Sequence, residues 1–482
     1  MTTTISVHCN GKDTVSKSDD NNTLEFFNPW NNEKLITLIE PTQEEVKNVI
    51  TNSVETFEKK RLTPQERYEI LSKAAEILKE RKREVAKVIS KDNGKPIKDA
   101  ETEVMRAHIT FQLSAEEARK INGYTEEIAP PVQADYSLGI TIREPVGVVC
   151  AITPFNFPLA LAAHKIGPAI AAGNTVIFKP SEQTTNTGQL LVDILHESGL
   201  PDGFLNMVVG RGNTVGETLL QDERINFYTF TGSARVGEYI KSKAGFRRVA
   251  LELGSNAPNI VHHDADLDLA VNSLVKAAFS YSGQVCISAQ RIYVHSKIFN
   301  KFVEKFTHLT KDLKLGNPLE DATDIGPVIN KANADRIVSW IDEARESGAE
   351  ILHGGRIFDG NVVEPTVVVN PNPSIKLMCE EVFGPVVSIN SYDCIDDLIT
   401  SVNASKYGLQ AGVFTRDIHT AINLARKIHV GGVNINNASI SRADSLPYGG
   451  VKQSGVGREG PRAAIEDMTE VKVITFNTIN NQ

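Results

Sequence analysis

Residues 147–178 read GVVCAITPFNFPLALAAHKIGPAIAAGNTVIF, which is an apolar run, a longer apolar stretch of helical composition and a second apolar run. Segments 147–152 and 175–178 are short and show little polar alternation, which is typical of strands that are buried on both faces. Residues 159–172 lie between them and predict a helix. A strand, a helix and a second strand in this order predict a parallel βαβ unit.

The same alternation continues toward the end of the chain. Further strands are predicted at 204–209 and 226–230, and a second series begins near residues 257–261. Parallel sheets of this kind are covered by helices on both faces and bind dinucleotides at their carboxyl edge. The sequence therefore predicts an α/β fold with a dinucleotide-binding, Rossmann-like parallel sheet and a second α/β domain. The other predicted helices are 186–198, 214–220, 234–244, 267–279, 296–312, 331–347, 395–404 and 418–428, and the other strands are 291–295, 366–369, 385–390 and 411–414.

Helices precede the first sheet. Capping boxes that begin at Thr42 and Thr63 predict two helices, the second of which runs to about residue 92. Another helix is expected at 98–120, so the N-terminal part of the chain should be largely helical.

A hairpin is expected after these helices, because residues 124–143 have a β-like pattern. The run 471–476 near the C-terminus is also β-like and could pair with this hairpin. Projections of this type often mediate contacts between subunits.

Length, charge and cysteine content limit the possible functions. A chain of 482 residues is expected to form two or three domains. Lys and Arg number 51 against 60 Asp and Glu, so the net charge of −9 argues against a nucleic acid or a membrane as partner. The N-terminus has no basic leader, and five cysteines without a CxxC motif suit reduced thiols. We therefore expect a cytoplasmic protein.

The segment 279–291, FSYSGQVCISAQR, contains the best candidate for a nucleophile. Cys286 lies between Gly283 and the small pair Ser288 and Ala289, so the backbone around it is uncrowded and a substrate could approach. A buried cysteine is more often a packing residue, and other segments have to decide between the two interpretations.

Two polar residues could assist such a thiol. Asn156 stands in a turn bounded by prolines, where its amide could donate to a developing oxyanion or could simply form the turn. Glu252 lies between two leucines. Burial there would raise its pKa and make it a base near neutral pH, whereas a surface turn is the alternative.

Residues that could bind a dinucleotide follow several predicted strands. Lys179 and Glu182 could both reach a ribose, and the Glu182 carboxylate would repel a 2′-phosphate, which favours NAD over NADP. Gly232 opens a strand-to-helix turn that either holds a phosphate or is a plain turn. Gly212 nearly belongs to a G-x-G-x-x-G motif, but Gly216 comes one position late.

The run from His262 to Asp268, HHDADLD, has the composition of a metal site. A calcium loop that starts at Asp264 would need glycine where Leu269 stands and glutamate where Val275 stands. We therefore expect these acids to cap the following helix and predict no metal site.

Seven motifs together resemble those of the aldehyde dehydrogenase superfamily in order and spacing, over essentially the whole chain. They are TPFNFP (153–158), KPSE (179–182), FTGS (230–233), LELG (251–254), GQVC (283–286), EEVFGP (380–385) and PYGGVKQSG (447–455). The resemblance implies a homodimer or homotetramer with three structural parts. These are an NAD-binding domain (1–122 and 143–252), a catalytic domain (253–440) and a β-hairpin oligomerisation element (123–142 and 462–482).

The resemblance also implies a mechanism. The Cys286 thiolate attacks the aldehyde carbon, and the Asn156 amide and the Cys286 backbone N–H stabilise the oxyanion. Hydride transfer to the nicotinamide leaves a thioester. In the hydrolytic members of the family, the residue that matches Glu252 activates the water that releases the acid.

Cofactor contacts follow from the same resemblance, with NAD as the expected cofactor and NADP as the less favoured one. Ser255 and Phe155 depart from the glycine and tryptophan that are common in the family, which leaves the reactive groups in place but affects loop geometry. The expected contacts are Ile152, Thr153, Pro154, Phe155, Lys179, Ser181 and Glu182, then Gly212, Gly232, Ser233, Val236, Leu253 and Gly254, and on the nicotinamide side Glu381 and Phe383.

The substrate tunnel is expected along one helix face. Phe157, Leu161 and His164 share this face, and in the family it borders the tunnel together with the position of Tyr448. His164 and the Tyr448 hydroxyl predict a small hydroxylated aldehyde such as lactaldehyde or glyceraldehyde, although His164 could equally be tucked against its helix. Val285 stands where non-phosphorylating glyceraldehyde-3-phosphate dehydrogenases have arginine, which disfavours a phosphorylated substrate.

Other functions stay open at this point. The chain could act on an aromatic or aliphatic aldehyde or semialdehyde, could pass the acyl group to CoA, or could be a non-catalytic protein of the same fold. CoA-acylating relatives generally lack a glutamate at the position of Glu252. An inactive relative would be expected to lose Cys286, Asn156 or Glu252, and all three are present.

Overall fold

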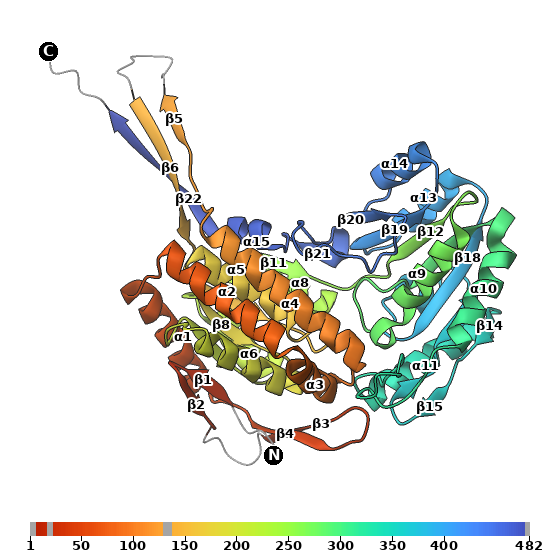
Figure 1. Cartoon of the computed structure of the whole chain (residues 1–482), viewed down its shortest axis with the longest axis horizontal. Coiled ribbons are helices and arrows are strands. Elements are labelled where there is room, and N and C mark those ends of the chain that lie inside the picture. Colours follow the sequence, from red (N-terminus) through yellow and green to blue (C-terminus); the bar gives the residue numbers. More distant parts are fainter. Residues whose placement is uncertain (1–5, 17–22, 129–136, 478–482) are drawn as a thin grey trace.

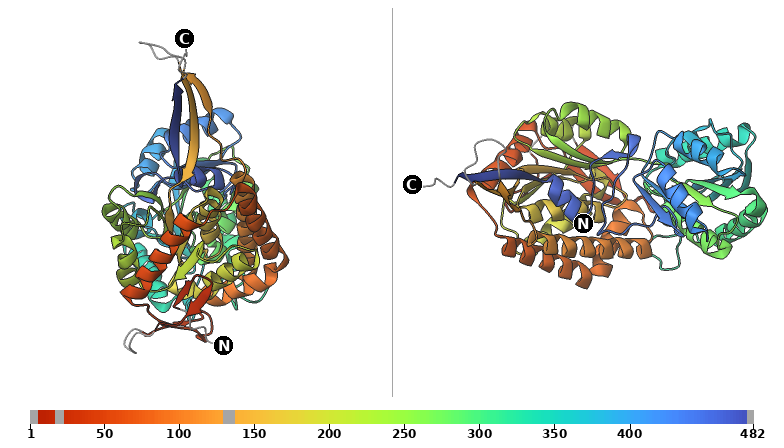
Figure 2. Two further views of the ribbon diagram at one scale, coloured as in Figure 1. Left: turned by 90° about the vertical axis from the view of Figure 1, so that its left-hand side faces the viewer. Right: turned by 90° about the horizontal axis from the view of Figure 1, so that it is seen from above.

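The computed structural model describes residues 6–16, 23–128 and 137–477. It shows two α/β bodies side by side, one built mainly from the first half of the chain and one from the second half (Figures 1 and 2). A β arm projects from the first body and contains the last described strand. No helix in the described ranges is long and apolar enough to cross a membrane.

An eight-stranded sheet forms the centre of the first body. Its five central strands are parallel. Four of them are apolar runs that are fully or almost fully buried, whereas the strand at 248–252 begins with an exposed and a half-buried residue. Antiparallel strands from both ends of the chain complete the sheet. The strands in spatial order are β2 (Lys12–Thr14), β1 (Val7–Cys9), β9 (Leu205–Val208), β8 (Thr175–Lys179), β7 (Val148–Ile152), β10 (Phe227–Thr231), β11 (Arg248–Glu252) and β21 (Gly455–Val456).

Helices cover both faces of this sheet. In β7, Val149 and Ala151 pack into one apolar cluster, whereas Val148 and Cys150 pack into another on the opposite face. The first cluster includes α2 (Pro64–Glu80), α3 (Lys82–Asn93), α4 (Ile97–Ala118), α5 (Ala160–Ala172) and α6 (Thr185–Glu197). The second includes α1 (Gln43–Lys59), α7 (Glu217–Gln221) and α8 (Ala234–Lys243).

The second body has a seven-stranded sheet, which also packs against apolar clusters on both of its faces. Along β13, Ile292 and Val294 face one cluster and Tyr293 faces the other, so this sheet is also buried on both sides. Its strands in spatial order are β14 (Glu350–His353), β17 (Thr366–Val369), β18 (Val386–Tyr392), β13 (Arg291–His295), β12 (Pro258–Val261), β19 (Gln410–Phe414) and β20 (Gly432–Ile435). The helices around it are α9 (Leu267–Phe279), α10 (Phe299–Lys311), α11 (Lys331–Glu346), α12 (Lys376–Cys379), α13 (Ile395–Asn403) and α14 (Ile418–Lys427).

The arm is a three-stranded antiparallel sheet in the order β22-β6-β5 (Figure 1). Here β22 (Thr469–Asn477) pairs along its whole length with β6 (Ser137–Pro145), and β6 pairs with β5 (Thr125–Ile128). The pairing of the C-terminal run with the hairpin is therefore as predicted. Parts of the predicted hairpin and of the segment 462–482 lie outside the described residues. Two further hairpins are β3 (Thr23–Phe27) with β4 (Lys34–Ile39) and β15 (Ile357–Asp359) with β16 (Val362–Val363), and a short helix, α15 (Pro461–Asp467), precedes β22.

Several local predictions differ from the structure. Both capping boxes are present, but the predicted second helix is divided into α2 and α3 because Arg81 leaves the helical conformation (φ −93°, ψ 19°). A π-helical turn, Gly212–Gly216, takes the start of the predicted helix 214–220. Strands β11, β14, β20 and β21 were not predicted, and β11 matters most because it carries Glu252.

Candidate active site

One edge of the first sheet gathers the predicted cofactor residues. Because β7 to β11 are parallel neighbours, the residues that end or follow these strands meet at the same edge. Ile152 and Lys179 end β7 and β8, and the predicted turns follow directly. Thus Thr153, Pro154 and Phe155 follow β7, Ser181 and Glu182 follow β8, Gly212 follows β9, Gly232, Ser233 and Val236 follow β10, and Leu253 and Gly254 follow β11.

Among the residues expected to contact the adenosine, the Lys179 ammonium and the Glu182 carboxylate form an ion pair at 3.0 Å. Ser233 caps α8 by accepting a hydrogen bond from the Val236 N–H at 3.4 Å. A Cβ atom at Gly232 would lie 2.4 Å from the Phe230 ring, so only glycine fits before this helix. These residues can hold a ribose and a pyrophosphate at the start of α8.

The residues expected to contact the nicotinamide side, Glu381 and Phe383, lie in the segment between α12 and β18. The buried Glu381 carboxylate accepts a hydrogen bond from the Ser255 backbone N–H at 3.0 Å, and burial raises its pKa to about 7. The Phe383 ring meets the edge of Phe155, with centroids 5.9 Å apart. Residues that follow strands of the first sheet therefore contact the segment before β18 of the second sheet.

The turn before Cys286 is strained. Tyr281, Ser282 and Gly283 all have positive φ angles, of 47°, 53° and 69°. The Ser282 hydroxyl donates to the Gly326 carbonyl at 2.7 Å, and a Cβ atom at Gly283 would lie 2.0 Å from the carbonyl oxygen of Gly384. Such a conformation persists only where surrounding contacts hold it, so Cys286 follows a rigid turn.

Asn156 lies against this turn. Its side-chain amide donates to the backbone carbonyl of Gln284 at 2.9 Å, although the two residues are 128 positions apart. Gln284 is itself fixed, because its side-chain carbonyl accepts from the Ile329 N–H at 2.9 Å. An Asn side-chain amide carries two N–H groups, and this bond uses one of them.

Glu252 is buried at the end of β11, and its Oε2 has no hydrogen-bond partner in the described part of the chain. Burial raises its pKa well above the usual range, and the nearby Glu459 raises it further. Burial also raises the pKa of the Cys286 thiol to about 11, and both Glu381 and Glu252 contribute to that increase. The structure therefore brings the three predicted catalytic residues into one region.

A buried network of charged side chains lies beside Glu252, and none of its members was predicted as a site residue. Glu459 binds Lys165 at 2.8 Å and Arg442 at 3.1 Å, which contributes to holding its pKa at about 2. Asp444 binds Arg106 at 2.7 Å and also contacts Arg442 at 3.4 Å. These residues come from distant parts of the chain and form no motif, so the only available sequence signal was a lysine within the apolar helix 159–172.

A cavity of about 260 Å³ opens onto Cys286. Three of the four predicted substrate residues, Phe157, Leu161 and Tyr448, line it. His164 does not line it, because its ring is fully buried and bonds Thr110 at 3.3 Å and Asp444 at 3.0 Å. The alternative interpretation of a histidine tucked against its helix therefore holds. The polar lining of the cavity comes from Tyr448, Arg106 and Arg442, together with Asp99, Thr102, Glu103, Lys276 and Ser280.

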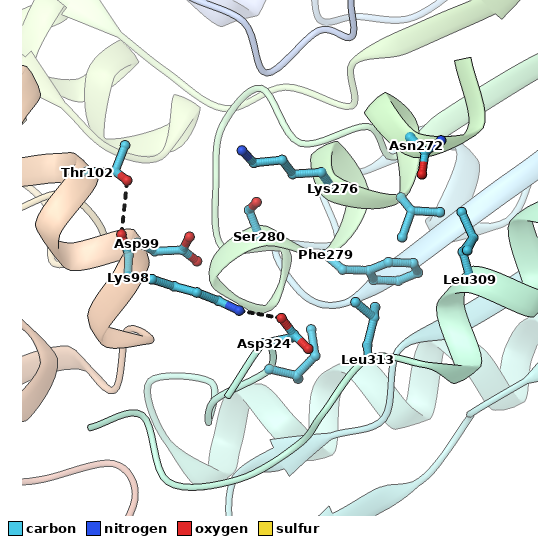
Figure 3. A pocket seen from close by; sticks show the side chains of 12 residues that line it. Lys98, Asp99, Thr102, Asn272, Lys276, Phe279, Ser280, Leu309, Leu313 and Asp324 are labelled. Atoms are coloured by element: carbon cyan, nitrogen blue, oxygen red, sulfur yellow. Dashed lines mark hydrogen bonds and ion pairs between the residues drawn. The ribbon is translucent and has the colours of Figure 1, made fainter. Parts of the chain in front are cut away.

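A second cavity of about 460 Å³ lies between α4 and α9 (Figure 3). Lys98 forms an ion pair with Asp324 on one side, and the Lys276 side chain extends from α9 on the other. The two cavities share Asp99, Thr102, Lys276 and Ser280 as lining residues. The two cavities are therefore adjacent.

The His262 segment lies at the carboxyl end of β12, in the second body. As predicted, an acid of this run caps the next helix, because Asp266 accepts from the Leu269 N–H at 3.1 Å. His262, His263 and Asp264 offer ligand atoms within 4.8 Å of one another and could hold a metal ion. The Asp264 carboxylate already accepts from the Thr415 hydroxyl at 2.8 Å.

Comparisons with known proteins agree with this geometry. The model of the aldehyde dehydrogenase family matches residues 15–474. A 3-sulfolactaldehyde dehydrogenase of Priestia megaterium is 46% identical over 454 residues, which cover 94% of this chain and 95% of the relative. A lactaldehyde dehydrogenase of Methanocaldococcus jannaschii is 40% identical over 461 residues, which cover 94% and 97%.

Solved structures of similar fold include two dehydrogenases. An NAD-dependent aldehyde dehydrogenase from Sinorhizobium meliloti has a TM-score of 0.94 at 33% identity and covers 99% of this chain and 95% of the other. The glyceraldehyde-3-phosphate dehydrogenase GapN from Methanocaldococcus jannaschii, complexed with NADP, has a TM-score of 0.89 at 39% identity. The match covers 96% of this chain and 100% of that one.

Proposed function

Because the chain belongs to the aldehyde dehydrogenase family, we propose that it oxidises a small polar aldehyde to the carboxylic acid through a thioester on Cys286. The observation that carries this proposal is the convergence of Cys286, Asn156 and Glu252 beside a cavity of about 260 Å³. The edge of the first sheet lies next to these residues and fits a nicotinamide cofactor. When bound, that cofactor accepts the hydride from the substrate.

Each of the three residues has a separate task. The Cys286 thiolate adds to the aldehyde carbon, and the free N–H of the Asn156 amide stabilises the oxygen that becomes negative. Glu252 then takes a proton from the water that hydrolyses the thioester. Burial raises its pKa, which makes the carboxylate a stronger proton acceptor than an exposed glutamate.

Release of a free acid, rather than transfer to CoA, follows from Glu252. A buried carboxylate with an unpartnered oxygen is available to bind and polarise water. Production of NADH from an aldehyde in the absence of CoA tests this point directly. A strict requirement for CoA would contradict hydrolysis.

For the cofactor, we propose a preference for NAD over NADP. Glu182 stands beside Lys179 at the edge of the sheet, where a carboxylate accepts bonds from ribose hydroxyls and repels a 2′-phosphate. Neighbouring structures include an enzyme described as NAD-dependent and one complexed with NADP, so both cofactors occur in this fold. The Glu182→Gln variant should lose part of its discrimination against NADP.

For the substrate, we propose a three-carbon hydroxyaldehyde of the lactaldehyde type. Relatives named for lactaldehyde and sulfolactaldehyde support this size and polarity. A second candidate is an aldehyde that also carries an acidic group, because Arg106 and Arg442 line the cavity. Their positive charge is partly balanced by Asp444 and Glu459, which favours the neutral hydroxyaldehyde.

An aldehyde panel tests the proposal. The purified enzyme is assayed without CoA on lactaldehyde, sulfolactaldehyde, hexanal and benzaldehyde, each with NAD and with NADP. We expect the highest kcat/KM for a small polar aldehyde with NAD and no turnover by Cys286→Ala. Cys394→Ala is the matched control, because Cys394 is an exposed free thiol in the second body. A higher kcat/KM for hexanal or benzaldehyde would contradict the polar-substrate proposal.

We also propose that the arm is the oligomerisation element and that the first and second sheets belong to the cofactor-binding and catalytic domains. Apolar side chains on β22 are exposed in the single chain, among them Val471, Val473 and Phe476. Exposed apolar side chains on a paired strand are typical of an interface between subunits.

A further inference from the structure

We propose that Tyr448 is a further catalytic residue, which donates a hydrogen bond from its hydroxyl to the Cys286 thiolate. This role goes beyond lining the cavity and concerns the nucleophile itself. It rests on the proposed function, in which the Cys286 sulfur attacks the aldehyde.

The contact is direct. The Tyr448 hydroxyl lies 3.5 Å from the Cys286 sulfur, within hydrogen-bond range for sulfur. Around these two groups the walls are mainly apolar, with Val285, Ile287 and Leu409 in the same buried cluster. Among the described residues, no other side chain hydrogen-bonds this sulfur, so Tyr448 is the side chain placed to stabilise its charge.

The direction of this hydrogen bond follows from the chemistry of the two groups. A thiolate can only accept, because it carries no proton. Burial raises the pKa of Tyr448 well above its ordinary value, and a charge on Cys286 would raise it further. The phenol therefore keeps its proton when the thiol is ionised and must be the donor.

Arg442 holds the phenol in place. Its guanidinium lies over the Tyr448 ring, 3.8 Å from the centroid, and its other side binds Glu459 at 3.1 Å. The backbones of Tyr448 and Glu459 exchange two hydrogen bonds, of 2.9 and 2.7 Å. Because the cation over the ring also withdraws electron density, it makes the phenol a stronger donor.

A donor is needed because burial raises the pKa of the Cys286 thiol, and the carboxyl groups of Glu381 and Glu252 raise it further. With a pKa of about 11, only about one molecule in ten thousand would carry the thiolate at pH 7. The Tyr448 hydrogen bond and the charge of Arg442 both act in the opposite direction and favour the thiolate. Removal of the phenol hydroxyl should therefore make the thiolate still rarer.

Alkylation of Cys286 as a function of pH tests the proposal. The rate of reaction with iodoacetamide is followed by mass spectrometry of the peptide that contains Cys286, in the full-length protein without substrate. We expect Tyr448→Phe to shift the midpoint upward by about one pH unit, which lowers the rate about tenfold below the midpoint. Tyr392→Phe is the matched control, because its buried hydroxyl bonds His262 at 2.8 Å, away from the thiol.

A second variant should shift the midpoint of the alkylation profile in the opposite direction. Replacement of Tyr448 by 3-fluorotyrosine retains the ring and the hydroxyl but makes the phenol more acidic, so the midpoint should move downward. This variant also keeps the test valid if Tyr448→Phe does not fold. An unchanged midpoint in a folded variant would overturn the proposal, even if turnover falls, because Tyr448 would then act only on the substrate.

The proposed function and this inference can fail separately. Absence of aldehyde oxidation in the wild type would contradict the proposed function, whereas the alkylation profile reports on the sulfur and the phenol without any substrate.

Discussion

The backbone N–H of Ser255 donates a 3.0 Å hydrogen bond to the side chain of Glu381. This bond joins the loop after β11 to the segment before β18, and hence the two sheets, at the proposed nicotinamide side of the cofactor site. The family commonly has glycine at position 255. Since the donor is a backbone group, serine preserves the bond, and the departure noted in the sequence leaves this contact intact.

Gly254 is the position where this arrangement is most sensitive. A Cβ atom at Gly254 would lie 2.4 Å from Glu381 Oε2, so Gly254→Ala must displace the carboxylate. Overpacking of this kind costs about 1–3 kcal/mol, and we expect the KM for NAD to rise by about tenfold. Gly216→Ala is the control, because a Cβ atom there meets nothing within 4 Å. Equal KM values in both variants would contradict the role of Glu381.

Binding of NAD should depend on pH through Glu381. Its pKa of about 7 means that the carboxylate is half protonated near neutral pH, and only the ionised form accepts bonds from both ribose hydroxyls. Affinity should therefore rise as the pH increases from 6 to 8 and then level off. Fluorescence titration of NAD measures this dependence. Glu381→Gln should bind more weakly with a flatter profile, and a flat wild-type profile would refute the assignment.

Stability should depend strongly on Lys165. Replacement by methionine leaves the buried Glu459 with one cation fewer, and the loss of one partner from a buried ion pair costs about 3–5 kcal/mol. Urea denaturation should show a clearly lower midpoint. In Lys59→Met the lost partner is the exposed Glu55, so that midpoint should hardly change. Similar midpoints in the two variants would show that the buried pair contributes little.

Assembly should depend on the arm. Val473 is 62% exposed on β22, and Val473→Asp would place a charge in the proposed interface. We expect light scattering coupled to size-exclusion chromatography to show a smaller assembly than in the wild type. Phe246→Asp is the control, because Phe246 is fully exposed on a loop of the first body. If only the control dissociates, the interface lies elsewhere.

Local signals explain what the sequence could predict. The capping boxes at Thr42 and Thr63 are both present, because the bonds that define them join residues three positions apart. Most buried parallel strands were predicted within two residues of their observed bounds, because an apolar run between turns is typical of such a strand. The parallel strands β11 (RVALE) and β20 (GVNI) were missed, because neither is a continuous apolar run. The break at Arg81 was missed because neither glycine nor proline marks it, and helical composition continues on both sides.

The interior of the active site could not be predicted in the same way. Arg106, Arg442 and Glu459 have no distinctive neighbours in the sequence, and only folding brings them together. The assignment of a polar role to His164 illustrates the limit. The spacing of His164 relative to Leu161 predicted that both side chains face the substrate tunnel. It could not show that Asp444, 280 residues later in the chain, binds the His164 ring outside the cavity.

The pairing of β21 with β11 has a consequence for protein synthesis. Glu252 is bordered by a strand at residues 455–456, and Tyr448, Arg442 and Glu459 come from the same late stretch. On the ribosome, the chain that already contains Cys286 has no phenol beside its sulfur until nearly all of translation is complete. A nascent or prematurely terminated chain therefore carries Cys286 without the residues that surround its sulfur in the folded protein, and the site is complete only in the finished molecule.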